Sequence, residues 1–294
     1  MEILAFDVGG SSIKFSVMTA DGEILTKGSV DTPDNLDDFY NELIQVKESL
    51  AVKYKLIGAA FSLPGAVDDA AGIIGGTSAL PYIHDFPIKR ALGEKLFLPV
   101  AMENDANCAA WAEHEIGASK GCKTSVMLTL GTGVGGGIII DHKLFKGKSG
   151  AAGEMHFKMY PDKRRKCTCG SWDCFEAYAS GTALKVDAEE MLNNPKVTTY
   201  DVMDGVKNGD KKMTEIFNRW INDITIGVNG LTNLFDPDCI VLSGSMAQFV
   251  DAKKMEEAVN CDIVTSPTSI RIATAGNYSG MIGAALLAFE SEAK

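Results

Sequence analysis

The stretch Leu4-Ala-Phe-Asp-Val-Gly-Gly-Ser-Ser-Ile-Lys-Phe-Ser-Val17 decides how the rest of the chain is interpreted. It predicts an apolar strand, a tight turn over Asp7 to Ser11, and a second strand. The adjacent glycines allow backbone angles that other residues avoid, and they let N–H groups approach phosphate oxygens without a Cβ in the way. Asp7, at the end of the entering strand, can hold a hydrated Mg²⁺ near such phosphates. An ordinary β-hairpin turn explains the same residues equally well.

A second copy of this arrangement lies at Ser125 to Ile140. Its glycines match G-x-G-x-x-G, but the dinucleotide-binding fingerprint requires a helix after the glycines, and Ile138 to Ile140 continues as a strand. The Walker A pattern G-x-x-x-x-G-K-[ST] does not occur in the sequence. Two strand-turn-strand phosphate loops, one opening each half, predict two related α/β lobes that hold a nucleotide between them.

Composition limits the classes of protein that fit this sequence. The 294 residues, of which 46% are hydrophobic, suffice for two domains with separate cores. The net charge of −11 argues against a general nucleic-acid surface and against attraction to anionic membranes. No apolar run approaches the roughly 18 residues of a membrane span, and no signal peptide precedes the first strand. We therefore expect a cytoplasmic protein with no nucleic-acid or membrane partner.

Acidic and amide side chains follow a short predicted strand at 98–102. Glu103-Asn-Asp-Ala-Asn107 lies between that strand and an Ala-rich helical run at 108–116. Helix capping alone would select Asn104 and Asp105 at this place. In a phosphoryl-transfer enzyme, Asp105 would instead accept the proton of a substrate hydroxyl as it attacks a γ-phosphate. Pro64-Gly65 ends another predicted strand, at the kind of sheet edge where α/β proteins bind ligands.

Three of the seven cysteines lie close together. Cys167, Cys169 and Cys174 form a cluster, and His156 lies a short way upstream. These residues have the ligand types and the number of a closed Cys₃His zinc site. The odd number of cysteines and their clustering suit a metal in a reducing compartment better than disulfides. Chance clustering of free thiols is the alternative.

Two further segments have both a functional and an ordinary interpretation. The basic run Lys163-Arg-Arg-Lys166 could belong to a nucleic-acid-binding zinc module, but the net charge of −11 favours a solvated basic loop. Ser243-Gly244-Ser245 follows a buried strand at 239–242. This loop could contact an adenosine, or it could be a plain turn at the end of a strand.

In this order and spacing the motifs resemble the ROK family of bacterial sugar kinases and related repressors, within the hexokinase and actin superfamily. The similarity spans essentially the whole chain. It is carried by Asp7-Val-Gly-Gly-Ser-Ser-Ile-Lys14, Pro64-Gly65, Glu103 to Asn107, Leu130-Gly-Thr-Gly-Val-Gly-Gly-Gly137, Gly153-Glu154 and Cys167 to Glu176.

The resemblance implies a fold and a domain organisation. The fold is the two-lobed α/β fold of actin- and hexokinase-like (ribonuclease H-like) ATPases, with the active site in the cleft between the lobes. Residues 1–107 would form the N-terminal lobe, to which a C-terminal helix at about 280–294 returns. Residues 108–279 would form the C-terminal lobe, which contains the Cys-rich zinc segment 154–176. The resemblance also implies a homodimer.

The activity implied is that of an ATP-dependent carbohydrate kinase. It would transfer the γ-phosphate of Mg-ATP to a hydroxyl, the 6-OH, of a hexose or hexose derivative, with Asp105 as the catalytic base. The residues implied to bind Mg-ATP are Asp7, Gly9, Gly10, Ser11, Lys14, Gly131, Thr132, Gly133 and Gly244. Those implied to bind the sugar are Gly65, Asn104, Asp105, Glu154, His156 and Glu176. A structural zinc ion is implied at His156, Cys167, Cys169 and Cys174.

The sequence departs from the family pattern at two places. Ser11 stands where the family has Thr, which keeps the hydroxyl. The zinc-binding members read Gly-Glu-x-Gly-His, whereas here His156 follows Glu154 by two positions and Phe157 occupies the place of the family's His. A one-residue slip would still deliver His156 to the metal. Some family kinases lack zinc and carry an aromatic residue at this position, so the cysteine spacing and Phe157 point in opposite directions.

Two other functions are compatible with parts of the pattern. The family's repressors place a DNA-binding domain before the first loop, where this chain has six residues, so we expect no repressor. A non-catalytic sugar sensor or an ATPase on the same fold is the alternative to a kinase. The residues do not decide among glucose, fructose, mannose, N-acetylmannosamine and β-glucosides as the substrate.

Overall fold

The computed structural model describes residues 2–20, 22–76, 78–162, 164–261 and 263–292. Contacts within the chain define two compact units. The first comprises Met1–Gly117, Leu144–Ala152 and Ala275–Lys294, and the second comprises Ala118–Lys143 and Gly153–Thr274. The division into lobes at residue 107 that we predicted from the sequence stays a prediction.

The first unit is built on a five-stranded sheet in the order β3 (Ile24–Asp31), β2 (Ser12–Thr19), β1 (Glu2–Val8), β4 (Leu56–Leu63) and β7 (Val100–Asn104). β2 is antiparallel to both β1 and β3, whereas β1, β4 and β7 are parallel. The carboxyl ends of these three parallel strands therefore share one edge of the sheet. A small hairpin of β5 (Ala66–Asp68) and β6 (Ile73–Gly75) follows β4.

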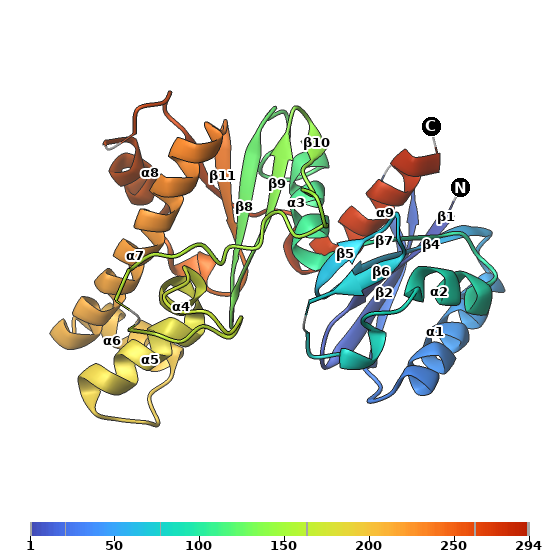
Figure 1. Cartoon of the computed structure of the whole chain (residues 1–294), viewed down its shortest axis with the longest axis horizontal. Helices are drawn as coiled ribbons and strands as arrows, with labels where there is room; N and C mark the ends of the chain where they lie inside the picture. The colour runs from blue at the N-terminus through green and yellow to red at the C-terminus, as the bar shows by residue number, and fades with distance from the viewer. Residues whose placement is uncertain (1, 21, 77, 163, 262, 293–294) are drawn as a thin grey trace. The chain divides into compact units, whose positions relative to one another are not determined.

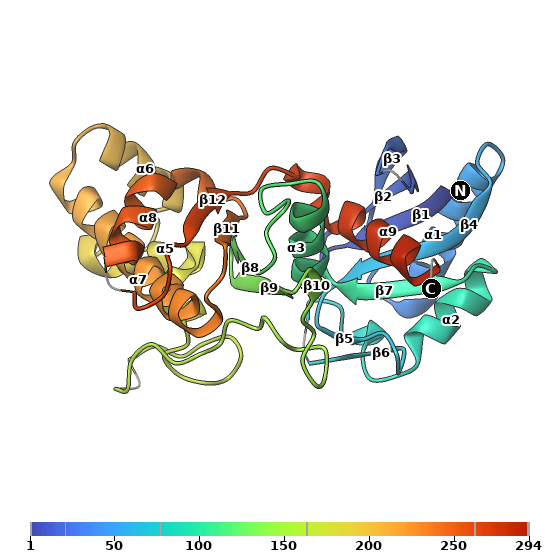
Figure 2. The ribbon, with the colours of Figure 1, turned by 90° about the horizontal axis from the view of Figure 1, so that it is seen from above.

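Both faces of this sheet are covered by helices, because side chains of β1 alternate between two cores. Leu4 and Phe6 pack with α1 (Leu36–Ala51) and α2 (Ile88–Leu96). Ile3 and Ala5 pack with α3 (Asp105–Glu115) and α9 (Ser279–Glu292). Figures 1 and 2 show α1 and α9 on opposite sides of the sheet. Helices α3 and α9 approach closely at Gly283, where a Cβ would lie 1.8 Å from the carbonyl oxygen of Cys108.

The second unit repeats this sheet plan. Its order is β10 (Lys143–Leu144), β9 (Val134–Ile140), β8 (Ser125–Leu130), β11 (Cys239–Ser243) and β12 (Ser269–Ile272). β8 and β9 form an antiparallel hairpin, and β8, β11 and β12 are parallel. The helices of this unit are α4 (Glu176–Ala179), α5 (Gly181–Leu192), α6 (Thr199–Lys207), α7 (Lys211–Phe235) and α8 (Ala252–Cys261).

Helix α7 is the main support of the second core. Ile216, Trp220, Ile224 and Val228 follow one another at four-residue spacing and are all fully buried. Each such burial contributes about 1.5–3 kcal/mol. The indole N–H of Trp220 donates to the carbonyl oxygens of Ala179 and Ser180, 3.0 Å away in each case. The helix begins at Lys211 because Asp210 caps it: the Asp210 side chain accepts a hydrogen bond from Met213 N–H at 3.0 Å.

Three short 3₁₀ helices complete the described elements: η1 (Pro81–Ile83), η2 (Ala247–Phe249) and η3 (Gly276–Tyr278). Within the described residues, the structure contains no helix with both the length and the apolar character needed to cross a bilayer.

Candidate active site and metal centre

The first glycine turn joins β1 to β2 and presents the Asp7 carboxylate. Asp7 Oδ1 accepts a hydrogen bond from Ser62 Oγ at 2.7 Å, and its Oδ2 lies 3.8 Å from Lys14 Nζ. Lys14 also donates to the carbonyl oxygen of Asn277 at 3.2 Å. Gly280 leaves room for the carboxylate, because a Cβ there would lie 2.6 Å from Asp7 Oδ1. Asp7 is therefore fixed in place but still partly open to solvent.

The glycines of this turn leave room for a ligand because they have no Cβ, and they do not adopt unusual backbone angles. Gly9 N–H donates to the carbonyl oxygen of Ser12, and Thr32 Oγ1 donates to the carbonyl oxygen of Gly9 at 2.7 Å. Neither Gly9 nor Gly10 has the positive φ that the sequence led us to expect. Gly9, Gly10 and Ser11 are exposed, so their backbone groups are open to a ligand.

The second glycine turn joins β8 to β9 and is held from behind by helix α5. Gly181 N–H donates to the carbonyl oxygen of Gly131 at 2.7 Å, and Thr182 Oγ1 donates to the carbonyl oxygen of Thr132 at 2.7 Å. A Cβ at Gly131 would meet no atom within 4 Å. The front of this turn is thus free for a ligand to approach its backbone.

Gly244 supports the same turn from the loop after β11. Its φ of +86° is accessible mainly to glycine, and a Cβ would lie 2.4 Å from the carbonyl oxygen of Leu130. Met246 N–H donates to that same carbonyl oxygen at 3.0 Å. The loop therefore packs directly on the end of β8, as a strand-end turn does. A contact of Gly244 with adenosine stays a prediction.

Asn104 and Asp105 lie at the carboxyl end of β7, where helix α3 begins. Asn104 caps the helix, since its Oδ1 accepts from Asn107 N–H at 3.1 Å, while its Nδ2 donates to the carbonyl oxygen of Gly65 at 3.0 Å. Asp105 is the first residue of the helix. The capping interpretation of Asn104 is therefore correct. It does not exclude a functional role, because the same side chain also contacts Gly65, another predicted site residue. β1, β4 and β7 end here, so Asp7, Gly65 and Asp105 share one edge of the sheet in the first unit.

Glu103, to which the sequence analysis gave no role, supports this turn from within. Its side chain is buried, and its Oε1 accepts hydrogen bonds from Asn104 N–H at 2.9 Å and from Asn107 Nδ2 at 3.0 Å. Its Oε2 forms an ion pair with Lys146. A charged residue directly before an Asn-Asp pair was the available signal in the sequence, but only the fold shows that it is buried.

The cysteine cluster and His156 come together in the second unit. The four potential ligand atoms of His156, Cys167, Cys169 and Cys174 all lie within 4.8 Å of one another. Cys169 Sγ and Cys174 Sγ are 3.5 Å apart, and Cys167 Sγ is 3.8 Å from His156 Nδ1. Tetrahedral zinc with Zn–S bonds of about 2.3 Å places ligand atoms roughly 3.3–3.8 Å apart. The donor set and its spacing therefore fit zinc.

Phe157 explains how His156 reaches the cysteines despite the altered spacing. Its ring stacks on Phe175, with centroids 5.0 Å apart, and its carbonyl oxygen accepts from Phe175 N–H at 2.9 Å. This pairing lays the segment after Glu154 against the segment of Cys174. His156 Nε2 lies 3.4 Å from Glu154 Oε2, which leaves Nδ1 facing the thiols.

Glu176 connects the cysteine segment to the second glycine turn. Its Oε2 accepts from Val134 N–H at 3.1 Å, and its Oε1 accepts a hydrogen bond from Thr168 Oγ1. A cavity of about 520 Å³ is lined by the turn, the cysteine segment and helix α5, among them Thr132, Gly133, Cys167, Thr168 and Glu176. Of the predicted site residues of the second unit, Thr132, Gly133, Cys167 and Glu176 line this cavity. Six others do not line it: Gly131, Glu154, His156, Cys169, Cys174 and Gly244.

In the basic run, Arg164 and Lys166 are exposed, as expected of a solvated loop, whereas Arg165 is not. Arg165 is mostly buried and forms an ion pair with the buried carboxylate of Asp187. Arg164 lies over the ring of Tyr160, 4.0 Å from its centroid. Lys163 lies outside the described residues.

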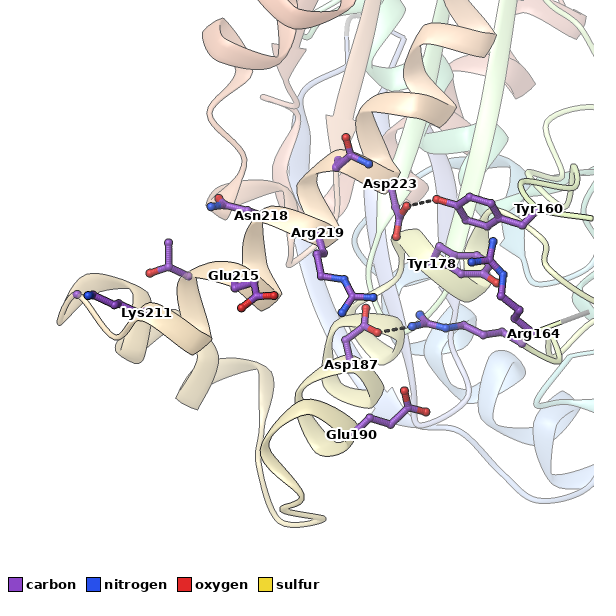
Figure 3. A pocket seen from close by; sticks show the side chains of 14 residues that line it. Tyr160, Arg164, Tyr178, Asp187, Glu190, Lys211, Glu215, Asn218, Arg219 and Asp223 are labelled. Carbon is purple, nitrogen blue, oxygen red and sulfur yellow. Dashed lines mark hydrogen bonds and ion pairs between the residues drawn. The ribbon is translucent and has the colours of Figure 1, made fainter. Parts of the chain in front are cut away.

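Arg164 and Arg165 also line a second, larger pocket of about 1000 Å³ between the cysteine segment and helices α5 and α7 (Figure 3). Across it Tyr160 donates to Asp223 at 2.5 Å, and burial together with this bond raises the pKa of Tyr160 to about 12. None of the described residues that we predicted for the active site lines this pocket.

Two α/β units that repeat one sheet plan, each with a glycine turn between its first two strands, define the class of protein as an actin-like ATPase fold. The sequence profile described as "ROK family" matches residues 3–291, and the chain belongs to this family. The predicted fold and family are thereby confirmed.

Individual relatives agree with this assignment. The chain is 31% identical to a glucokinase of Halalkalibacterium halodurans, over 97% of this chain and 94% of that protein. The crystal structure of a ROK hexokinase from Thermus thermophilus is similar over 100% of both chains, with a TM-score of 0.88 and 30% identity. A ROK family glucokinase from Streptomyces griseus, in complex with glucose and AMPPNP, has a TM-score of 0.81 and 28% identity, covering 99% of this chain and 100% of that chain.

Proposed function

We propose that this protein is an ATP-dependent kinase that phosphorylates a hexose or hexose derivative on a hydroxyl, the 6-OH. The observation that carries the proposal is the shared sheet edge of the first unit, where Asp7, Gly65 and the Asn104–Asp105 turn lie at the ends of three parallel strands. A carboxylate for a metal and a carboxylate for a proton at one edge are what phosphoryl transfer requires.

We assign the nucleotide to the two glycine turns. In the first unit Asp7 would hold the hydrated Mg²⁺ of Mg-ATP, with Gly9, Gly10, Ser11 and Lys14 facing phosphates. In the second unit the open backbone of Gly131, Thr132 and Gly133 would bind phosphate oxygens, and Gly244 would contact the adenosine. Backbone N–H groups and Mg²⁺ are needed because the chain as a whole carries a charge of −11. Bound Mg²⁺ supplies neutralisation of the phosphate charge.

We assign the sugar to Gly65, Asn104 and Asp105 of the first unit and to Glu154, His156 and Glu176 of the second. Carboxylate and amide groups suit this task because sugar hydroxyls both donate and accept hydrogen bonds. Asp105 orients the attacking hydroxyl and accepts its proton. It is the first residue of α3 and directly follows Asn104, whose side-chain amide donates to the carbonyl oxygen of Gly65.

Zinc is the cofactor for which the second unit supplies ligands, namely His156, Cys167, Cys169 and Cys174. The ion would cross-link the segment of Glu154 to the segment of Glu176 and take no part in the chemistry. The carboxylate of Glu154 beside His156 Nε2 supports this assignment, because metal-bound histidines usually donate their second N–H to such a group.

We also propose a cytoplasmic homodimer. The free thiols and the need for ATP support the compartment, and the family resemblance supports the dimer. Light scattering of the eluting protein during gel filtration tests the oligomeric state.

The test is a coupled ADP-release assay with Mg-ATP and a panel of hexoses, N-acetylhexosamines and β-glucosides. Asp105→Asn should lower kcat by about 10²–10⁴-fold with unchanged ATP affinity, because only the proton acceptor is lost. Asp38→Asn, which alters an exposed carboxylate in the first turn of α1, is the matched control and should retain full activity. Full activity of Asp105→Asn would refute the assignment of the base. Sugar binding without ADP release in the unaltered protein would point to the sensor.

A further inference from the structure

The segment Leu144–Ala152 belongs to the first unit, although the chain on both sides of it belongs to the second. This nine-residue excursion ends directly before Gly153-Glu154, and Glu154 is one of the residues to which we assign the sugar. Whatever fixes the excursion in the first unit therefore also fixes the start of a sugar-binding segment.

Two contacts fix the excursion. Lys146 forms an ion pair with Glu103 Oε2, and Gly150 packs so tightly that a Cβ would lie 2.2 Å from the carbonyl oxygen of Val67. The excursion is also closed on itself, because Ala152 N–H donates to the carbonyl oxygen of Lys146 at 3.1 Å. A displacement of Lys146 is thus passed to Ala152, two residues from Glu154.

The Glu103 carboxylate is a charged group in an unusually buried position. Its side chain is only 3% exposed, and a buried carboxylate is costly unless it is paired and hydrogen-bonded. Its Oε1 accepts from Asn104 N–H and Asn107 Nδ2, both in the turn that carries Asp105. Lys146 is the only cation that forms an ion pair with it among the described residues.

The surroundings explain why the pair can form inside the protein. A cavity of about 120 Å³ is lined by Phe61, Asp69, Glu103 and Lys146, together with side chains of α9. The charged side chains in its wall and the partial exposure of Lys146 leave the remaining donors of the ammonium group within reach of water. The ammonium of Lys146 is partly exposed, so the charge pair reaches from the turn to the surface.

We propose that Glu103 and Lys146 are positioning residues for phosphoryl transfer: their ion pair orients the Asn104–Asp105 turn and anchors the segment that leads into Glu154. This proposal rests on the proposed function, because it explains how one ion pair places both the catalytic base, Asp105, and a sugar-binding residue, Glu154. Neither residue touches the reacting atoms. Without Lys146, the Glu103 carboxylate would be left buried with no cation beside it, and its hold on the turn would weaken.

The experiment compares Lys146→Met with Lys148→Met. Lys148 lies in the same excursion, is exposed, and forms no ion pair with another described residue. Lys146→Met should lower kcat about tenfold and raise the KM for the sugar about threefold, with the KM for ATP unchanged. Lys148→Met should match the unaltered protein in all three constants, and Lys146→Arg should restore activity to within about threefold.

A double-mutant cycle isolates the pair from general destabilisation. Glu103→Gln keeps an oxygen for Asn104 and Asn107 but removes the charge, so the double variant Glu103→Gln with Lys146→Met should be no less active than Lys146→Met alone. The double variant can still be measured if Lys146→Met alone does not fold, because the double variant leaves no buried charge unpaired.

Three results would overturn the proposal: additive losses in the cycle, a Lys146→Met variant as active as Lys148→Met, or a parallel rise of both KM values. If the unaltered protein releases no ADP with any sugar, the proposed function fails. The effect of the ion pair on the segment of Glu154 is then measured by calorimetric titration with the sugar. Lys146→Met should weaken the affinity for the sugar about threefold, and Lys148→Met should leave it unchanged. Equal affinities of the two variants would refute the anchor by itself.

Discussion

The two glycine turns look alike in sequence, yet the structure gives them different tasks. The turn of the first unit carries a carboxylate, Asp7, which Ser62 and Lys14 hold in place. The turn of the second unit carries no acidic residue of its own and is braced from outside, by helix α5 behind it and by Glu176 in front. One turn is therefore suited to a metal ion and the other to direct contact of its backbone with phosphate oxygens.

The glycines differ in the same way. At Gly131 an added Cβ would meet nothing, whereas at Gly133 it would lie 2.5 Å from Glu176 Oε2. The first glycine leaves space for a ligand, and the second leaves space for a side chain of the protein. A repeated motif thus does not imply that its corresponding residues have the same function.

The largest effect that this comparison predicts is at Asp7. Asp7→Asn should lower kcat with Mg-ATP by about 100-fold or more, because the amide cannot balance the charge of the metal. The ADP-release assay measures this loss, and raising the Mg²⁺ concentration should recover part of it. Asp31→Asn, at the exposed end of β3, is the control and should retain activity. Equal activity of the two variants would remove the distinction between the turns.

A smaller effect is expected from loss of zinc, because the ion would hold the segments of Glu154 and Glu176, to which we assign the sugar, and would not itself contact either glycine turn. Cys174→Ser should remove the metal, lower the thermal midpoint by about 5 °C or more and raise the KM for the sugar about tenfold, with a small change for ATP. Metal analysis of protein purified without added zinc should give about one equivalent for the unaltered chain. Cys261→Ser, which changes an exposed cysteine, is the control. Well under one equivalent in the unaltered protein would contradict the assignment.

The smallest and sharpest contrast is between two glycines of one turn. Gly133→Ala should displace Glu176 from Val134 N–H and cost about 1–3 kcal/mol in the free energy of unfolding, measured with urea. Gly131→Ala should change stability by less than about 0.5 kcal/mol but weaken ATP binding, because its methyl group occupies ligand space. If both variants lose stability equally, Gly131 also has a structural role and the space before it is not reserved for a ligand.

Much of this protein was determined by local sequence. The apolar residues that begin at Leu4 predicted β1, and the glycine-rich stretches predicted both turns, because each of these signals depends on neighbours in the chain. The spacing of Cys167, Cys169 and Cys174 predicted a metal centre for the same reason. These signals, in order, were specific enough to indicate the family.

Tertiary structure decided the features that depend on residues far apart in the chain. The sequence could not show that Phe157 would stack on Phe175 and turn His156 toward the thiols, or that Arg165 would pair with the buried carboxylate of Asp187. Nor could it show that Lys146 would return to the first unit and neutralise Glu103. Whether a charged side chain needs a partner depends on its burial, and burial is set by the packing of the whole chain. Strands, turns and ligand types, in contrast, can be predicted from residues that are close in sequence.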